Sequence, residues 1–431
     1  MTAFQYAIGR TVAMLALASG ATAAGGQSLA SRVAAAGAGE VRMTFATRAG
    51  VCGDGRNVVA VADVFTMYPS IESHGGWSRA NCAPGVARVA LHVGTAGIET
   101  IRTHVGGSWE ALTRHVTDLG AVSATSAAAY FLDVADRSEG RVTRNALLAA
   151  VIADSADVTP RLLSIAQRVA APAETRRQAI NWLGAFGDAA IVPALAALAR
   201  SGDDEKRSVG EAALVALSQV ADGAGIPALI ELARTAASTT FRGKAVFWLG
   251  QSGDARGRRE VRMIAGDDTA ASEVRAKAVF ALGQGDATTA DDFHFLRDLF
   301  ARVDNAAIRD QILMSMSEGN AADAAQWLLS VARDEQAPVE SRRKAIFWAG
   351  QGSVTSTADI ARAYDEIASE SVKEHAIFVL SQRDDKAATD KLLAIVHGRD
   401  SAELRKKALF WLGQRDDNAA TRAISDLVTR P

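Results

Sequence analysis

The segment 404–414, LRKKALFWLGQ, recurs along the chain and constrains the fold more than any other feature. Close copies are 241–251 (FRGKAVFWLGQ), 274–284 (VRAKAVFALGQ), 341–351 (SRRKAIFWAGQ) and 372–382 (VKEHAIFVLSQ), and weaker copies are 142–152, 175–185, 209–219 and 308–318. The central residues, Ala in every copy except Ile312, follow one another at intervals of 31 to 34 residues. Such a regular interval predicts an array of stacked structural repeats.

Each copy has the periodicity of an amphipathic helix. Relative to the central residue, positions −4, 0, +1 and +4 are apolar, as in Leu404, Ala408, Leu409 and Leu412. At 100° per residue these positions share one face, which we expect to form the stacking core. The small central Ala suits the place where two helices cross at a short distance.

The residues after each copy predict a turn and a second helix. We expect Gly at +5 to end the helix, because glycine adopts positive φ without strain; it occurs at Gly184, Gly250, Gly283, Gly350 and Gly413. We expect Asp in the turn to cap the next helix, at Asp188, Asp222, Asp254, Asp286 and Asp416. Pro193 and Pro227 then suit the first turn of that helix. Each repeat therefore reads helix, turn, helix, turn.

The pattern R-x-x-A-x-x-x-L-G-x-x-G-D, around residues 176–188 and 275–286, resembles the short bacterial HEAT repeat, also called the phycobilisome-lyase HEAT-like repeat. The resemblance covers about seven tenths of the chain and implies an architecture more than an activity. We predict a mainly α protein, with a right-handed α-solenoid of about nine HEAT-like helix pairs over residues 121–431. The arrangement resembles that of exported bacterial HEAT-repeat proteins.

Composition excludes some partners and compartments. The formal net charge of −2 gives no overall bias toward nucleic acid or an anionic membrane. No segment approaches the roughly 20 apolar residues that a membrane-spanning helix needs. Residues 1–30, with Arg10, a short apolar run and small residues at 21–23 or 28–30, are typical of a cleaved signal peptide. We therefore expect an exported protein, periplasmic or extracellular, without a membrane span.

Residues 31–120 have the alternating pattern of strands, and we predict a small antiparallel β domain there. The strongest runs are 41–45, 58–65, 89–93 and 98–105, with a hairpin turn at 94–97. The two cysteines, Cys52 and Cys82, both lie in this domain. In an exported chain they are expected to form a disulfide.

The second helices also carry aromatic residues that do not belong to the stacking face. These are Phe247, Trp248, Phe280, Phe347, Trp348, Phe378, Phe410 and Trp411, at positions +2 and +3. Position +2 points about 200° from the core direction, so these Phe residues either form a ridge on the concave surface that binds a protein partner, or pack between adjacent helices.

Basic residues at −3 to −1 either form a positive rim or pair with acidic turns such as Asp267 and Asp268, and we favour pairing. Gln at +6 is interpreted as a structural amide.

Candidate catalytic groups are few. The array contains His294, His375 and His397 without a His-Glu pair, whereas helical-repeat deoxyhypusine hydroxylases bind iron through such pairs. In the β domain, Cys52 with His74, His92, His104 or His115 leaves open a nucleophile or metal site. We predict no catalytic residue, metal or cofactor, and a non-enzymatic protein-binding scaffold of the bacterial envelope. The alternatives are an enzyme or metal-dependent module in the β domain, a bilin-lyase-like activity implied only by the repeat type, and a structural spacer.

Overall fold

The computed structural model of the chain describes residues 27–61, 82–109, 115–201, 209–284, 289–318 and 322–414. By their contacts these residues form two units. Unit 1 holds the strands, α1 (Leu29–Ala36), most of α2 (Ala124–Arg137) and the end of α3 (Gly140–Val151). Unit 2 holds the other described helices. The predicted domain boundary at residues 120 and 121 thus lies just before a helix that groups mostly with the strands.

Unit 1 is built on a four-stranded sheet in the order β5-β4-β1-β6. The strands are β1 (Gly39–Phe45), β4 (Ala87–Gly94), β5 (Gly97–Val105) and β6 (Val116–Ala121), and a two-stranded sheet adds β2 (Val51–Gly53) and β3 (Val58–Val61). The predicted hairpin is confirmed, because β4 and β5 pair antiparallel up to Gly94 and Gly97. Val41, Met43 and Phe45 of β1 are buried, and the Phe45 ring lies 6.3 Å from that of Phe131 in α2.

One strand of the sheet departs from the predicted antiparallel arrangement. β6 was not predicted, and it pairs parallel with β1, so the sheet is mixed. The sequence of β6, VTDLGA, has no alternation, and none of its residues is buried. One end of β6 is held by α1 instead, since Arg32 Nη2 donates to the carbonyl of Leu119 at 2.7 Å.

Helices α2 to α19 form nine consecutive pairs in the described chain, as the repeat spacing predicted. In unit 2 the first helices of the pairs are α4 (Thr159–Gln167), α6 (Val192–Ser201), α8 (Ile226–Thr235), α10 (Ala255–Gly266), α12 (Ala290–Arg302), α14 (Ala322–Arg333), α16 (Thr357–Glu366) and α18 (Lys386–His397). The second helices are α5 (Ala173–Phe186), α7 (Val209–Gln219), α9 (Thr239–Gln251), α11 (Ser272–Gly283), α13 (Ala306–Glu318), α15 (Val339–Gln351), α17 (Glu370–Ser381) and α19 (Ala402–Gly413).

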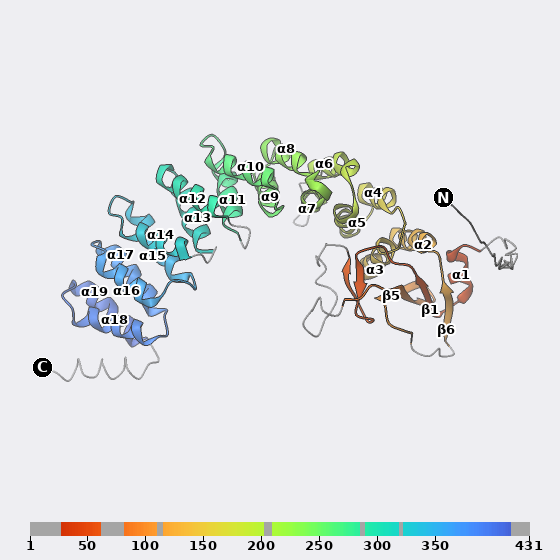
Figure 1. Cartoon of the computed structure of the whole chain (residues 1–431), viewed down its shortest axis with the longest axis horizontal. Coiled ribbons are helices and arrows are strands. Elements are labelled where there is room, and N and C mark those ends of the chain that lie inside the picture. Colours follow the sequence, from red (N-terminus) through yellow and green to blue (C-terminus); the bar gives the residue numbers. More distant parts are fainter. Residues whose placement is uncertain are drawn as a thin grey trace, which may run out of the picture. The chain divides into compact units, whose positions relative to one another are not determined.

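The second helices form one row, in which each contacts the next from α5 to α19 (Figure 1). Each second helix also packs on the first helix of its own pair. No helix in the described part of the chain is long and apolar enough to cross a membrane.

The predicted stacking face is confirmed. The central residues from Ala179 to Ala408 are fully buried, and so are the residues at +1 from Ile180 to Ile377. Leu409 differs, with 38% of its surface exposed. It belongs to α19, after which the described residues contain no further helix to cover it.

The explanation expected for the repeated Gly is wrong. None of the five glycines at +5 has positive φ, and α9 and α15 each continue one residue beyond theirs. The structure gives another reason, which is close contact with the following second helix. A Cβ on Gly184 would lie 2.6 Å from Cα of Ala216, and one on Gly283 would lie 2.4 Å from Cβ of Ser315. Glycine is needed because the backbones approach too closely for a side chain.

Helix starts agree with the prediction at some positions. Asp188 accepts a hydrogen bond from the Ala190 amide at 2.8 Å, and Asp254 accepts one from the Arg256 amide at 2.7 Å. Asp222 has φ of 57° instead, and the N-cap residue of α8 is Gly225, so this helix has no side-chain cap. Pro193 and Pro227 lie in the first turns of α6 and α8, as expected. Asp286 and Asp416 are outside the described residues.

Candidate functional site

The cysteines of unit 1 form the disulfide Cys52–Cys82, which closes a loop with a sequence separation of 30. Cys52 therefore offers no thiol to act as a nucleophile. Nor are the histidines gathered, since His92 faces Glu99 at 3.6 Å while His104 contacts the carbonyl of Arg56. In the described ranges no three His, Cys, Asp or Glu side chains are placed to hold a metal ion. His74 lies outside those ranges.

Unit 1 has a second polar cluster, which the sequence reasoning missed. The guanidinium groups of Arg42 and Arg88 each lie 4.9 Å from the centre of the Trp109 ring. Arg88 also donates to the carbonyls of Gly55, Gly106 and Ser108. Burial, with Arg42 nearby, lowers the pKa of Arg88. Since its donors are used on three loop carbonyls, Arg88 fixes the loops at this end of the sheet.

The aromatic row of unit 2 consists of the residues at +2 of the second helices. Phe247 stacks on Phe280 with ring centres 6.1 Å apart, and Phe347 stacks on Phe378 at 6.5 Å. Phe378 meets Trp411 edge-on at 5.4 Å. Met314 occupies the same position in α13, between the two stacked pairs. The rings are half-buried against one another, and Phe410 in α19 is 57% exposed. The rings therefore pack between repeats and still present one side to solvent, and their binding to a partner stays a prediction.

Trp248, Trp348 and Trp411 at +3 are also half-buried, and each contacts the Phe beside it. Ring centres are 5.2 Å apart for Phe247 and Trp248, 5.1 Å for Phe347 and Trp348, and 5.2 Å for Phe410 and Trp411. No other described group accepts a hydrogen bond from the indole N–H of these three Trp residues. They therefore widen the aromatic row and keep a donor beside it.

A charged row runs beside the aromatic row, nearer the start of each second helix. Lys244 pairs with Glu211 at 3.0 Å, Lys407 pairs with Glu374 at 2.6 Å, and Lys344 pairs with Asp310. In each pair the lysine, at −1, reaches the acid at −2 of the preceding second helix. The expected pairing with an acidic turn occurs at Arg275, which lies 2.7 Å from Asp268. Pairing therefore accounts for most of this basic row, and its partners are mainly on neighbouring helices.

Other steps between second helices lack an acid and a lysine at these two positions. At the contact of α15 with α17 the two positions hold Arg343 and His375, and the Arg343 side chain donates to the imidazole at 3.3 Å. Arg343 also pairs with Glu340 at 3.0 Å. His375 therefore takes the place of a lysine in the row.

The arginines at −3 have a role that the sequence reasoning missed. Arg176 donates through Nε to the carbonyl of Ala166 at 2.9 Å, and Arg275 and Arg342 make the same bond to Ala265 and Ala332. Each carbonyl lies near the C-terminal end of the preceding first helix, where carbonyls lack helical partners. The constant Arg of R-x-x-A was the available signal, and its function is to cap the first helix of its own repeat.

The glutamines at +6 form a third row beyond the aromatic row. Gln219, Gln251, Gln351, Gln382 and Gln414 are exposed. The expectation that these amides satisfy helix ends is not supported. Within the described chain Gln382 bonds only its neighbour Ser381, and the side chains of the others, Gln284 included, make no hydrogen bond.

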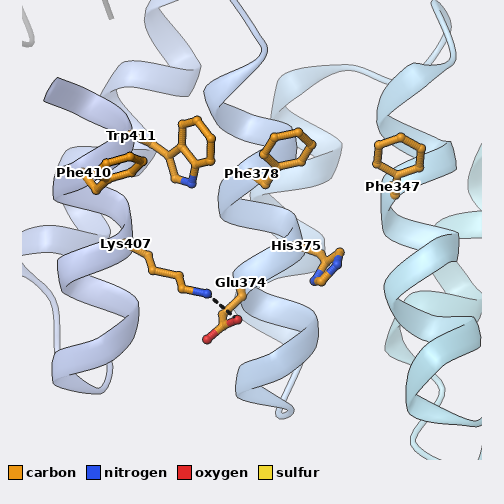
Figure 2. Close-up of a pocket in the computed structure, with 7 residues that line it drawn as sticks. All are labelled: Phe347, Glu374, His375, Phe378, Lys407, Phe410 and Trp411. Carbon is orange, nitrogen blue, oxygen red and sulfur yellow. Dashed lines mark hydrogen bonds and ion pairs between the residues drawn. The ribbon is translucent and has the colours of Figure 1, made fainter. Parts of the chain in front are cut away.

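The aromatic and charged rows meet at a groove of about 450 Å³. It is lined by Phe347, Glu374, His375, Phe378, Lys407, Phe410 and Trp411. In Figure 2 the rings lie in one line across three helices, and the Lys407–Glu374 pair and His375 lie in a second line beside it. Of the predicted site residues, Phe347, Phe378, Phe410 and Trp411 thus come together at the groove, whereas Trp348 lines a separate small cavity. The other predicted residues, Phe247, Trp248 and Phe280, lie further along the same row.

Comparisons with known proteins agree with this architecture. Residues 159–250 match the sequence profile of the family described as HEAT repeats. The matched stretch spans the three helix pairs from α4 to α9. No curated protein matches the chain in sequence.

Solved structures that align with the chain include a deoxyhypusine hydroxylase, a phycocyanin lyase complex and importin beta. Human deoxyhypusine hydroxylase in complex with glycerol is 18% identical, with 58% of this chain and 93% of that chain covered and a TM-score of 0.28. The CpcE and CpcF complex of phycocyanin lyase from Nostoc has the same identity and TM-score, with 58% and 94% covered. Importin beta is 16% identical, with 69% and 42% covered and a TM-score of 0.30. At these identities and scores the chain is not assigned the activity of any of them.

Proposed function

We propose that the face of the second helices that carries the aromatic row binds a protein partner and that the chain is a non-enzymatic scaffold. The observation that carries the proposal is the line of half-exposed rings across the groove between α15, α17 and α19. Apolar rings beside paired charges resemble the centre of a protein interface, where buried aromatic residues supply most of the binding energy. Phe410, at 57% exposure, has the most surface left to bury.

Site-specific photo-cross-linking tests this proposal. Benzoylphenylalanine is placed at position 410 in one variant and at position 293 of α12 in another, since Phe293 is a half-buried ring of a first helix. A partner in extracts of the source cells should cross-link through position 410 and not through position 293. Equal cross-linking at both positions, or none at 410, would contradict the proposal.

A paired variant shows whether the rings supply the binding energy. Phe378→Ala with Phe410→Ala removes two rings of the groove, and Phe293→Ala with Phe295→Ala removes two rings of α12 as the matched control. Each lost aromatic anchor should weaken partner binding by about 2 kcal/mol. Capture of the cross-linked partner should fall only in the groove variant. If the groove variant still captured the partner, the aromatic groove would not be the partner's binding site.

We also propose that the chain is exported to the cell envelope, with a signal peptide cleaved after residue 23 rather than after residue 30. Residues 21–23 lie outside the described chain, but Leu29 and Val33 of α1 are buried in unit 1, and Arg32 bonds Leu119. Cleavage after Ala30 would remove Leu29 from this packing. Intact mass measurement of the secreted protein tests this, and a mature chain starting at Ser31 would contradict it.

A further inference from the structure

The face of the second helices that carries the aromatic row presents three parallel rows with different chemistry. Relative to the central residue, positions −2 and −1 lie at about 160° and 260°, position +2 at about 200° and position +6 at about 240° on the helical wheel. They therefore face the same way on successive turns. From the start of the helix to its end, the rows carry ion pairs, apolar rings and amides.

The amide row is unusual because its hydrogen-bonding groups are unused. Glutamine has two donors and one acceptor on its side chain. In the described chain Gln351 and Gln414, which flank the groove region, are exposed and make no side-chain bond. The indole N–H groups of Trp348 and Trp411 are also without acceptors there. Donors aligned beside apolar rings match a ligand that has regularly spaced carbonyls and apolar side chains, which is a peptide main chain.

The spacing of the helices favours one peptide conformation. Packed helices lie about 8 to 10 Å apart, so each row repeats with about that spacing. A polyproline II helix has three residues per turn and rises about 3.1 Å per residue, so it presents the same side chain direction about every 9.3 Å. A peptide in this conformation can place one apolar residue per repeat on the aromatic row. The turns of an α-helical ligand repeat every 5.4 Å, so its side chains would not match the spacing of the rings.

Unpaired cations on the same face indicate the charge of the ligand. Lys406, at −2 of α19, is exposed and has no ion-pair partner in the described residues. Lys277, at −1 of α11, lies over the Phe280 ring at 5.6 Å and likewise has no anionic partner in that part of the chain. The acids of the charged row, Glu211, Asp310 and Glu374, are all paired with lysines. Glu318, at +6 of α13, is an exposed acid on this face, whereas α15, α17 and α19 carry Gln at that position. The part of the face on these three helices therefore complements an acidic ligand.

We propose that this face binds a polyproline II peptide segment of the partner, lying across the second helices, with an apolar residue at every third position and acidic residues toward the charged row. This proposal rests on the proposed function, since it specifies what the aromatic groove binds. The rings would contact the apolar residues, the Gln amides and Trp N–H groups would bond the peptide carbonyls, and the free lysines would face its acids.

The test uses the full chain and a synthetic twelve-residue peptide, four repeats of Leu-Pro-Glu with blocked ends. Calorimetry and Trp fluorescence report binding. One control peptide has Lys in place of Glu, and a second has the same composition in the order Leu-Leu-Pro-Pro-Glu-Glu, which breaks the three-residue period. The regular acidic peptide should bind at least about tenfold more tightly than either control.

Variants of the chain identify the contacting rows. Gln351→Ala, Gln382→Ala and Gln414→Ala together should weaken binding at least about tenfold. Gln167→Ala, Gln326→Ala and Gln336→Ala are the matched control, because these exposed amides lie outside the second helices. Lys406→Glu should reduce binding of the acidic peptide and improve binding of the lysine peptide. Circular dichroism checks that each variant is folded.

Two results would overturn the proposal. The first is a contact result that contradicts the proposed binding mode. Equal binding of the regular and rearranged peptides would show that the three-residue period of the peptide does not matter, and unchanged binding in the triple Gln variant would show that the Gln amides do not contact it. The other is no binding of any peptide. If position 410 still cross-links to a cellular partner in that case, the polyproline II ligand is wrong and the protein-binding function stands.

Discussion

At the scale of single residues, the repeated Gly shows how one residue type is selected by a neighbour that is distant in sequence. Gly184, Gly250, Gly283 and Gly350 each face position +3 of the next second helix, where a Cβ would come within 2.2 to 2.8 Å of another atom. Gly413 has the same place in its repeat, yet no atom lies within 4 Å of its added Cβ among the described residues. The requirement for glycine is therefore imposed by the contact between helices.

We predict opposite effects for the same substitution at two of these positions. Gly283→Ala places a Cβ 2.8 Å from the carbonyl oxygen of Ser315, and we expect a loss of about 1 to 3 kcal/mol in the free energy of unfolding. Gly413→Ala should be neutral or stabilise by up to about 1 kcal/mol, because alanine favours helix. Urea unfolding measures both. A stabilising Gly283→Ala would mean that the helices separate without cost.

A second prediction at this scale concerns the cap of α10. The side-chain hydrogen bond from Arg256, with the backbone bond, lowers the pKa of Asp254 from 3.8 to about 2, against an opposing effect of burial. Asp254→Ala should cost about 1 kcal/mol near neutral pH. Since the folded-state pKa is depressed, this contribution is complete above about pH 4 and is lost as the pH falls through about 2. The difference in stability between wild type and variant should shrink over that range. Asp384→Ala, at an exposed residue, is the control.

At the scale of helices, Asp292 is the main polar contact between α10 and α12. Its carboxylate is fully buried, lies 2.6 Å from Nε of Arg258 and 2.7 Å from Nε of Arg262, and completes a capping box with Thr289. Burial alone would raise the pKa of Asp292, but the hydrogen bonds from Thr289, Arg262 and Arg258 lower it overall. The carboxylate therefore stays ionised and joins two consecutive first helices.

Asp292→Asn should be strongly destabilising. It keeps the shape of the side chain but leaves two arginines without their shared anion, and the expected cost is about 3 kcal/mol. Hydrogen exchange should show the loss first in α10 and α12, because each repeat contacts mainly its neighbours. The exposed neighbour Asp291→Asn is the control. Equal exchange in both variants would show that Asp292 does not couple the helices.

The contacts between second helices also follow a pattern that pairs residues of adjacent repeats. Where +5 is Gly, the next helix has Ala216, Ala281, Ser315 or Val379 at +3. Where +5 is Ser218, Ser317 or Ser381, the next helix has Trp at +3. Ser317 and Trp348 line the same small cavity. The large Trp side chain therefore occurs at +3 where the preceding second helix has Ser instead of Gly at +5. Packing between the second helices thus determines which repeats carry Trp.

At the scale of the whole molecule, the two units are stabilised in different ways. Unit 2 gains stability from stacking of successive repeats, whereas unit 1 has a small sheet, two buried arginines and the chain's single disulfide. We predict that Cys52→Ser with Cys82→Ser lowers the stability of unit 1 by about 3 to 4 kcal/mol, from the lost constraint on the unfolded loop. Thermal unfolding followed by hydrogen exchange should show unit 1 affected and unit 2 unchanged. Equal destabilisation of both would mean that they unfold together.

The sequence by itself determined the repeat, the helix pairs, the buried face of each second helix and the position of its aromatic residues. These follow from periodicity, because the backbone geometry of a helix places residues that are three or four apart on one face. The hairpin and the cysteine pair were also predictable, since both depend on local patterns or on there being only two cysteines.

Only the tertiary structure decided what those residues contact. The reason for Gly283, the capping role of Arg275, the stacking of Phe347 on Phe378 and the unused amide of Gln351 depend on atoms about one repeat away or on the opposite helix of the pair. The parallel pairing of β6 with β1 likewise joins strands about 75 residues apart. A local pattern carries no information on such distances, because they are set when neighbouring helices and strands pack together.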